Sequence, residues 1–221
     1  MHAIHTFLQP LLRFCKKLLR TYNGTMSWII VGLGNPGPEY VKTHHNAGRT
    51  AVEHFAKKFG AEEWRFDKHA NAQVAKVNDD GVSATCVLPD TFMNKSGSAV
   101  VKYVKSVKAA QKLVVVYDDL DLPLGRIKIS FARSSGGHKG IESIMRATKT
   151  DQFVRVRIGI APENAKGNAK VITSEEKVLK LILGKFKPAE EAELKKVWKR
   201  VTDTLATIVR DGHVKAMNEF N

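Results

Sequence analysis

A histidine and a group of aspartates are the residues of this sequence best suited to general-base chemistry. His45 follows a short apolar run and a loop rich in glycine and proline, and three aspartates, beginning with Asp118, follow a second apolar run. A carboxylate that accepts the N–H of an imidazole fixes the tautomer of the ring and stabilises the imidazolium that forms when the ring takes a proton. Such a pair activates water, and the absence of a nucleophile motif such as G-x-S-x-G favours direct attack by that water. The residue pattern alone does not decide among Asp118, Asp119 and Asp121.

Two asparagines could complete such a site. Asn35 stands just after the first apolar run, and clefts in α/β sheets open at the carboxyl ends of strands. Asn94 lies in the loop of residues 91–97, where its amide could hold the oxyanion of an attacked carbonyl and lower the barrier by about 3 kcal/mol. The alternative for Asn94 is a structural one, as part of an N-cap cluster for the helix that follows.

A dinucleotide-binding loop is disfavoured. The glycines within residues 32–37 have the spacing G-x-G-x-x-G, but Pro36 and Pro38 crowd the amides that would hold a pyrophosphate. The acid at a suitable distance, Glu53, falls inside an expected helix and not at the end of a strand. We therefore expect these glycines to serve turn geometry, and we expect no NAD.

Metal ligation is the rival use of the same histidines and aspartates. The possible ligands are His44, His45, Asp118, Asp119 and Asp121, but no spacing such as H-E-x-x-H is present. The sequence therefore predicts neither a metal nor an organic cofactor.

The charge balance indicates a polyanionic partner. The chain has 221 residues and a formal net charge of +14, a surplus that most often serves nucleic-acid binding. Five basic residues are expected on the solvent-facing sides of strands or nearby, as a phosphate-binding face: Arg126, Lys128, Arg133, Arg155 and Arg157. A glycine-rich loop with His138 and Lys139 leads into a helix, a setting that also favours phosphate. The alternative is an ordinary solvated surface.

Residues 1–25 differ from the rest of the chain. They carry lysines and arginines and no acid, with apolar residues at helical spacing, which is typical of a mitochondrial targeting segment. The alternative is a start assigned too far upstream, in which case a cytoplasmic protein begins at Met26. No apolar run approaches the ~20 residues of a membrane-spanning helix, so we expect no membrane association, and no protein partner is evident.

Residues 26–221 alternate expected strands and helices. Strands are predicted at residues 28–31, 72–77, 82–88, 113–117, 126–132 and 153–160. Helices are predicted between and after them, including one that runs from Ser96 to Val107 and one that begins with a capping box of Thr173 and Glu176. The pattern indicates a single three-layer α/β/α domain with a mixed, mostly parallel sheet.

Several blocks in this order resemble the bacterial-type peptidyl-tRNA hydrolase family. They read VGLGNPGPEY, HHNAG, TFMNKSG, YDDLDLPLG, GGHKG and RIGI, and they extend from Trp28 to about Ile160. The resemblance implies a monomeric, cofactor-free enzyme with a phosphorylase/hydrolase-like α/β fold. Its expected reaction is hydrolysis of the ester between a peptide and the 3′ ribose of tRNA.

The resemblance also implies roles for individual residues. His45 would be the general base and Asp118 its partner, and Asn35 and Asn94 would position substrate and water. The residues that would line the peptide cleft or bind the acceptor stem, the CCA end and the 5′ phosphate of the tRNA are Tyr40, Met93, Asn46, His138, Lys139, Lys128, Arg157 and Arg126.

Two positions depart from the family pattern. Lys139 stands where the family usually has an asparagine that helps to gate the cleft and hold the CCA end, and Ser130 stands where the family has a second phosphate-clamping lysine, a role that Arg126 could take. The N-terminal segment is foreign to bacterial members and fits an organellar enzyme. The alternative function is an inactive RNA-binding homologue, which the retained His45 and Asp118 disfavour.

Overall fold

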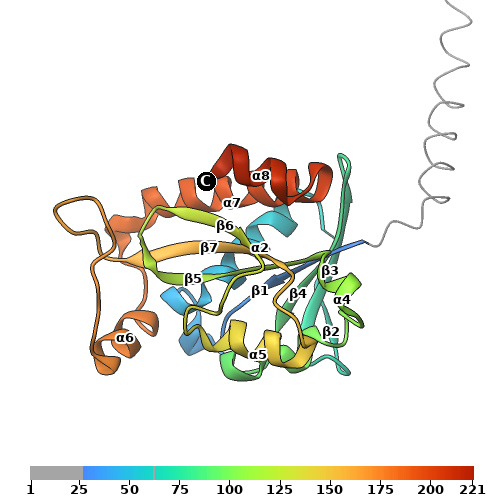
Figure 1. The fold of residues 1–221 in the computed structure, drawn as a ribbon, viewed down its shortest axis with the longest axis horizontal. Helices are drawn as coiled ribbons and strands as arrows, with labels where there is room; N and C mark the ends of the chain where they lie inside the picture. Colours follow the sequence, from blue (N-terminus) through green and yellow to red (C-terminus); the bar gives the residue numbers. More distant parts are fainter. Residues whose placement is uncertain (1–26, 62) are drawn as a thin grey trace, which may run out of the picture.

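A seven-stranded mixed sheet forms the centre of the molecule, in the order β2-β3-β4-β1-β5-β7-β6 (Figure 1). The computed structural model describes residues 27–61 and 63–221, so the predicted targeting segment lies outside the described residues. The central strands are parallel neighbours: β4 (Val82–Pro89), β1 (Trp28–Gly32), β5 (Leu113–Pro123) and β7 (Val154–Ala161). Antiparallel pairs flank them, formed by β2 (Arg65–Asp67) and β3 (Ala72–Asp79) on one side and by β6 (Ile127–Phe131) on the other. The predicted mixed sheet is confirmed.

Helices cover both faces of this sheet and give the three layers that the sequence predicts (Figure 1). One face packs against α2 (Ala47–Lys58), α7 (Glu191–Asp211) and α8 (His213–Phe220). The other packs against α3 (Ser96–Val100), α4 (Val107–Ala110) and α5 (Lys139–Thr148). Burial on both faces explains why the central strands are nearly continuous apolar runs. Across the part of the chain that the structure describes, every helix is too short or too polar to span a bilayer.

Two predicted helices differ from the observed ones. The helix expected from Ser96 to Val107 is divided, because Ser106 accepts a hydrogen bond from the backbone N–H of Ala109 (3.1 Å) and starts α4 as a separate helix. The prediction of a capping box formed by Thr173 and Glu176 is wrong. Helix α6 (Glu175–Ile182) has its N-cap one residue later than Thr173, and no side chain caps it.

Close packing explains Gly32 better than turn geometry does, and it also explains Gly48 in the first turn of α2. Gly37 has a φ of 112° and does need the freedom of a glycine. A Cβ on Gly32 would lie 2.7 Å from the carbonyl oxygen of Gly48, and a Cβ on Gly48 would lie 2.1 Å from that of Val116. These glycines let α2 lie directly on β1 and β5. The predicted turn role therefore applies to Gly37, whereas Gly32, together with Gly48 in the first turn of α2, allows the backbone of α2 to lie close to β1 and to Val116 of β5.

Candidate active site

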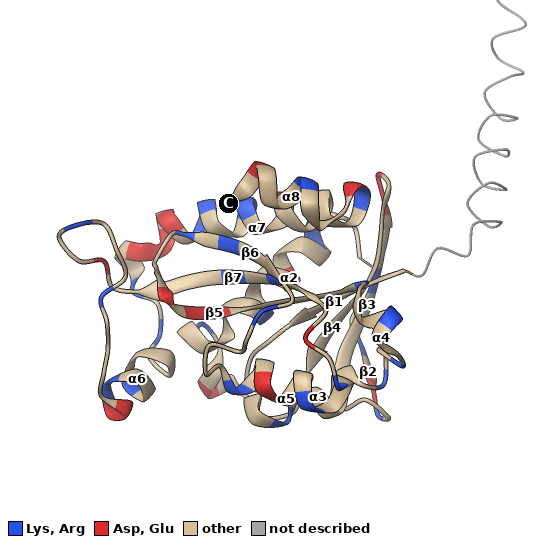
Figure 2. Cartoon of the chain, viewed as in Figure 1, with Lys and Arg blue, Asp and Glu red and all other residues tan. Residues whose placement is uncertain are grey.

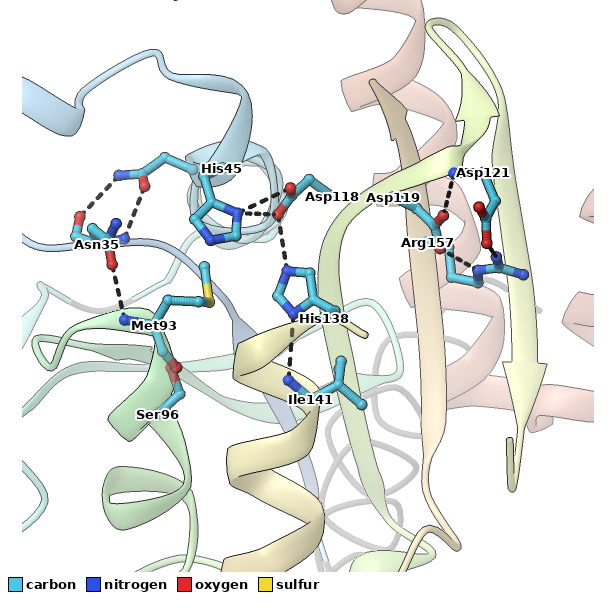
Figure 3. A network of polar contacts seen from close by, with 11 residues as sticks. Asn35, His45, Met93, Ser96, Asp118, Asp119, Asp121, His138, Ile141 and Arg157 are labelled. Carbon is cyan, nitrogen blue, oxygen red and sulfur yellow. Dashed lines mark hydrogen bonds and ion pairs between the residues drawn. The ribbon is translucent and has the colours of Figure 1, made fainter. Parts of the chain in front are cut away.

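His45 and Asp118 meet beside β5, just past the carboxyl end of the neighbouring strand β1. His45 lies on a short 3-10 helix, η2 (His44–Asn46), which leads into α2, and Asp118 lies on β5 itself. The Nδ1 atom of His45 is 3.0 Å from both carboxylate oxygens of Asp118, and the two side chains are 10% and 2% exposed (Figure 3). Asp119 and Asp121 instead face Arg157. The fold thus decides which of the three aspartates pairs with His45, a choice that the residue pattern leaves open.

A second histidine contacts the same carboxylate. The Nε2 atom of His138 is 3.1 Å from an oxygen of Asp118, and its Nδ1 accepts a hydrogen bond from the backbone N–H of Ile141 (3.3 Å) as the N-cap of α5 (Figure 3). Because Nδ1 accepts, the ring proton is on Nε2, which donates to Asp118. Asp118 therefore accepts an N–H from each ring, and the Nε2 atom of His45 is the one that can take a proton. From sequence His138 was expected only to contact substrate, although its place before a helix indicates the N-cap role.

Burial and charge act in opposite directions on this pair. Burial lowers the pKa of His45, but the charge of Asp118 and its hydrogen bond raise it, and the net result is a pKa above the ordinary 6.5. Burial by itself would raise the pKa of Asp118. The two neighbouring imidazoles and their hydrogen bonds outweigh burial and hold the pKa of this carboxyl well below its usual range. Asp118 therefore stays ionised, and His45 has the basicity that a general base needs near neutral pH.

A cleft of about 380 Å³ opens beside the pair. His45 and His138 line it together with the glycine loop of residues 135–137, and α6 forms the facing wall with Val178 and Ile182. The cleft thus combines a polar, titratable part with an apolar wall. This combination suits a ligand that carries both polar and apolar groups.

Asn35 and Asn46 hold the loop beside His45. The Oδ1 atom of Asn46 accepts the backbone N–H of Asn35 (2.8 Å), and its Nδ2 donates to the carbonyl oxygen of Asn35 (2.9 Å). The Oδ1 atom of Asn35 accepts the backbone N–H of Met93 (2.8 Å), whose side chain points toward His45 (Figure 3). The structure therefore shows a loop-holding contact for Asn46, and its predicted contact with substrate stays a prediction. Asn35 keeps its Nδ2 as a donor.

Three other predicted residues lie around the site without contacting the pair. Asn94, on the 3-10 helix η3 (Met93–Lys95), is exposed and lies outside the lining of the cleft. Tyr40 is half-buried at the end of the 3-10 helix η1 (Pro38–Tyr40). Lys139 lines the cleft, with 71% of its side chain exposed and its Nζ atom 3.6 Å from Glu142. Of the three, only Lys139 lies in the cleft of His45.

A second hollow, of about 500 Å³, adjoins the cleft and contains basic residues. Lys128 on β6 and Arg157 on β7 are directly paired across the two strands, and both line this hollow together with Arg133. Ser135 and Gly136 line both the hollow and the cleft. The basic surface predicted from sequence is therefore continuous with the site of His45.

Two of the arginines predicted for this surface are placed differently: Arg155 lines the hollow but is buried, and Arg126 lies outside its lining. Arg155 is 1% exposed and donates to the backbone carbonyl groups of Arg133 and Ser134, so the prediction that it faces solvent is wrong. The alternation along β7 is real, but the loop that carries Arg133 covers this face of the strand. Arg126 is exposed and lies outside the lining of the hollow, where Arg133 is found instead.

The histidine–aspartate–histidine group is also the one cluster of the described residues that could share a metal ion. The ligand atoms of His45, Asp118 and His138 lie within 4.8 Å of one another. The two N–H groups directed at one carboxylate explain this spacing without an ion. Metal binding at these nitrogens would require each ring to move its proton to its other nitrogen, and His138 would then lose the hydrogen bond from Ile141. The arrangement fits a hydrogen-bonded base better than a metal centre.

Replacing His138 by asparagine tests whether this ring orients Asp118. Asparagine is a good N-cap, so the variant His138→Asn should keep the start of α5, but its shorter side chain does not reach Asp118. We expect an unchanged unfolding temperature and a kcat about 10-fold lower, the range of one hydrogen bond to a charged group. Thermal melting and single-turnover kinetics measure the two effects, and an unaltered kcat would contradict the positioning role.

The fold and the site define an α/β protein with a cleft in which a histidine–aspartate pair can activate water. The sequence profile of peptidyl-tRNA hydrolase matches residues 29–221. The chain is 38% identical to the peptidyl-tRNA hydrolase of Chloroflexus aurantiacus over 196 residues, which cover 88% of this chain and 98% of that protein. It is 35% identical to the peptidyl-tRNA hydrolase of Thermodesulfovibrio yellowstonii, with 87% and 98% covered. The crystal structure of peptidyl-tRNA hydrolase from Acinetobacter baumannii matches with a TM-score of 0.76 and 32% identity, covering 88% of this chain and 94% of that one. The chain belongs to the peptidyl-tRNA hydrolase family.

Proposed function

We propose that this protein hydrolyses the ester bond of peptidyl-tRNA and releases a peptide and free tRNA. The observation that carries the proposal is the buried pair of His45 and Asp118 at the edge of an open cleft, in a chain that belongs to this family. Ionised Asp118 fixes the proton of His45 on Nδ1, so that Nε2 can accept a proton from water. An apolar wall and a basic surface adjoin the cleft and suit the two parts of such a substrate.

The reaction proceeds by attack of water on the ester carbonyl. His45 takes a proton from the water as its oxygen bonds to the carbonyl carbon, and Asp118 stabilises the imidazolium that forms. The tetrahedral intermediate then expels the 3′ oxygen of the ribose, which receives the proton from His45. The Nδ2 atom of Asn35 and the amide of Asn94 are the proposed donors to the substrate carbonyl groups.

The tRNA lies, in this proposal, across the adjoining basic hollow. Figure 2 shows basic positions on β6 and β7 close to the acidic residues of β5. Lys128 and Arg133 are exposed there, while Arg157 is held in place by Asp119 and has 21% of its side chain exposed. Lys128 and Arg157 would bind the 5′ phosphate of the acceptor stem. Lys139, in the cleft, is then placed to meet a phosphate of the CCA end.

Hydrolysis of N-acetylated aminoacyl-tRNA by the purified protein is the direct test of this function. We expect release of deacylated tRNA, with much slower turnover of the aminoacyl-tRNA that lacks the acetyl group. Binding of tRNA without any release of N-acetyl amino acid would instead indicate an RNA-binding protein and contradict the proposal.

The variant Lys128→Ala tests the proposed phosphate contact. Removing one lysine–phosphate contact should weaken tRNA binding several-fold and lower the slope of log K against log salt concentration by about 1. The matched control is Lys76→Ala. Lys76 is an exposed lysine on β3, near the opposite end of the strand order from β6, and its removal should change neither the tRNA affinity nor the salt slope. Titrations of labelled tRNA at several salt concentrations measure both values. An unchanged slope in Lys128→Ala would exclude this contact.

A further inference from the structure

Helix α6 forms a wall of the cleft but has little apolar packing to hold it there. None of its residues is buried, and Leu179 is 48% exposed. Val178, Leu179 and Ile182 nevertheless line the cleft opposite His45. Contacts other than a hydrophobic core must therefore fix the position of this wall.

The segment directly before His45 supplies those contacts. The Nδ1 atom of His44 is 2.8 Å from the carbonyl oxygen of Leu181 in the last turn of α6. The backbone N–H of His44 donates to the carbonyl oxygen of Gly184 (2.9 Å), and a β-bridge joins Thr43 to Lys185. A carbonyl oxygen can only accept, so Nδ1 of His44 carries the proton and donates it. The end of α6 is thus tied to the residue that adjoins the proposed general base.

The ring of His44 is itself held against the main body of the protein. It is 8% exposed and packs edge-on against Phe186, with ring centres 4.3 Å apart. Phe186 in turn packs against Trp198 of α7, at 6.3 Å. His44 therefore connects a weakly packed helix to the rigid layer formed by α7.

We propose that His44 is a positioning residue that sets the place of α6 and thereby the width of the cleft. This inference rests on the proposed function, since the cleft is the site where peptidyl-tRNA would bind. The contact between His45 and Asp118 does not pass through the ring of His44. Loss of the His44 hydrogen bond therefore weakens substrate binding and leaves the chemical step intact.

Two substitutions of nearly equal size separate the hydrogen bond from the packing. His44→Asn keeps an N–H donor at the δ position, and His44→Leu has a carbon there. For His44→Leu we expect a KM about fivefold higher, a kcat within about twofold of the unmodified protein, and hydrogen exchange of the α6 amides about fivefold faster, the factor that one ordinary hydrogen bond supplies. For His44→Asn we expect KM, kcat and the exchange of the α6 amides to lie close to the values of the unmodified protein. The amides of α7 serve as the internal reference for global stability.

The outcomes distinguish this inference from the proposed function. Unchanged exchange of α6 in His44→Leu, or equal losses in both variants, would overturn the role of the hydrogen bond. A lower kcat at unchanged KM would overturn the effect on binding. If His44→Leu destabilises α7 as well, His44→Phe, which keeps a ring against Phe186, repeats the comparison. If the unmodified protein fails to hydrolyse peptidyl-tRNA, the proposed function is wrong, while the exchange of α6 still decides whether His44 holds it.

Discussion

The variant His45→Ala should lose about 10²–10⁴-fold in kcat for peptidyl-tRNA, the range that general-base catalysis contributes. Alanine removes the atom that accepts the proton of the attacking water, and no other described side chain shares the carboxylate of Asp118 except His138, whose Nε2 already donates to it. The affinity for tRNA should stay within about twofold, because the basic hollow is untouched. Single-turnover hydrolysis and tRNA titration measure the two quantities.

The matched control for this variant is His69→Ala. His69 is exposed in the turn between β2 and β3, where its ring makes no hydrogen bond that the structure records. We expect unchanged hydrolysis there. Near-normal turnover by His45→Ala would refute the mechanism, and an equal loss in both histidine variants would point to a general effect on the protein.

The variant Asp118→Asn should lower kcat for peptidyl-tRNA by up to about 10⁴-fold, the loss that the same change produces in a catalytic triad. An amide has one acceptor oxygen and no negative charge, whereas the carboxylate uses both of its oxygens to accept N–H groups from the two rings. Where it presents its own N–H to Nδ1 of His45, the ring proton moves to Nε2, and that atom can no longer accept a proton. Asp203→Asn, the same change on the exposed face of α7, is the control and should have no effect.

The pH dependence of kcat/KM adds an independent check on this pair. The neutral form of His45 is the active one, and Asp118 raises the pKa of His45 above 6.5. Activity of the unmodified protein should therefore fall as the pH drops through that raised pKa. In Asp118→Asn the charge that raises the pKa is lost while burial still lowers it, so the inflection of the residual activity should move to lower pH. An inflection that stays in place would show that Asp118 does not tune His45.

Local patterns were sufficient for most of the strands and for the choice of reactive residues. Continuous apolar runs mark β1 and β5 because both faces of these strands are covered, and alternation marks β6 and β7. Local patterns failed where a single side chain decided a boundary, as Ser106 does at α4. They also failed for Arg155, because alternation gives the face of a strand but not what covers that face.

The sequence by itself determined that a histidine and a carboxylate follow apolar, strand-forming runs, that the chain is strongly basic, and which family it resembles. It did not determine that β5 continues past Asp118 to Pro123. The residue pattern left Asp118, Asp119 and Asp121 open and the family resemblance pointed to Asp118, but only the tertiary structure showed its contact with His45. Only the tertiary structure decided that His138 shares that carboxylate and that His44 contacts α6. Each of these contacts joins residues far apart in the chain, except for the pair of Asp118 and His138, which are 20 residues apart. Their distances depend on the register of β5 and on how closely α2 approaches it, and no local pattern encodes either.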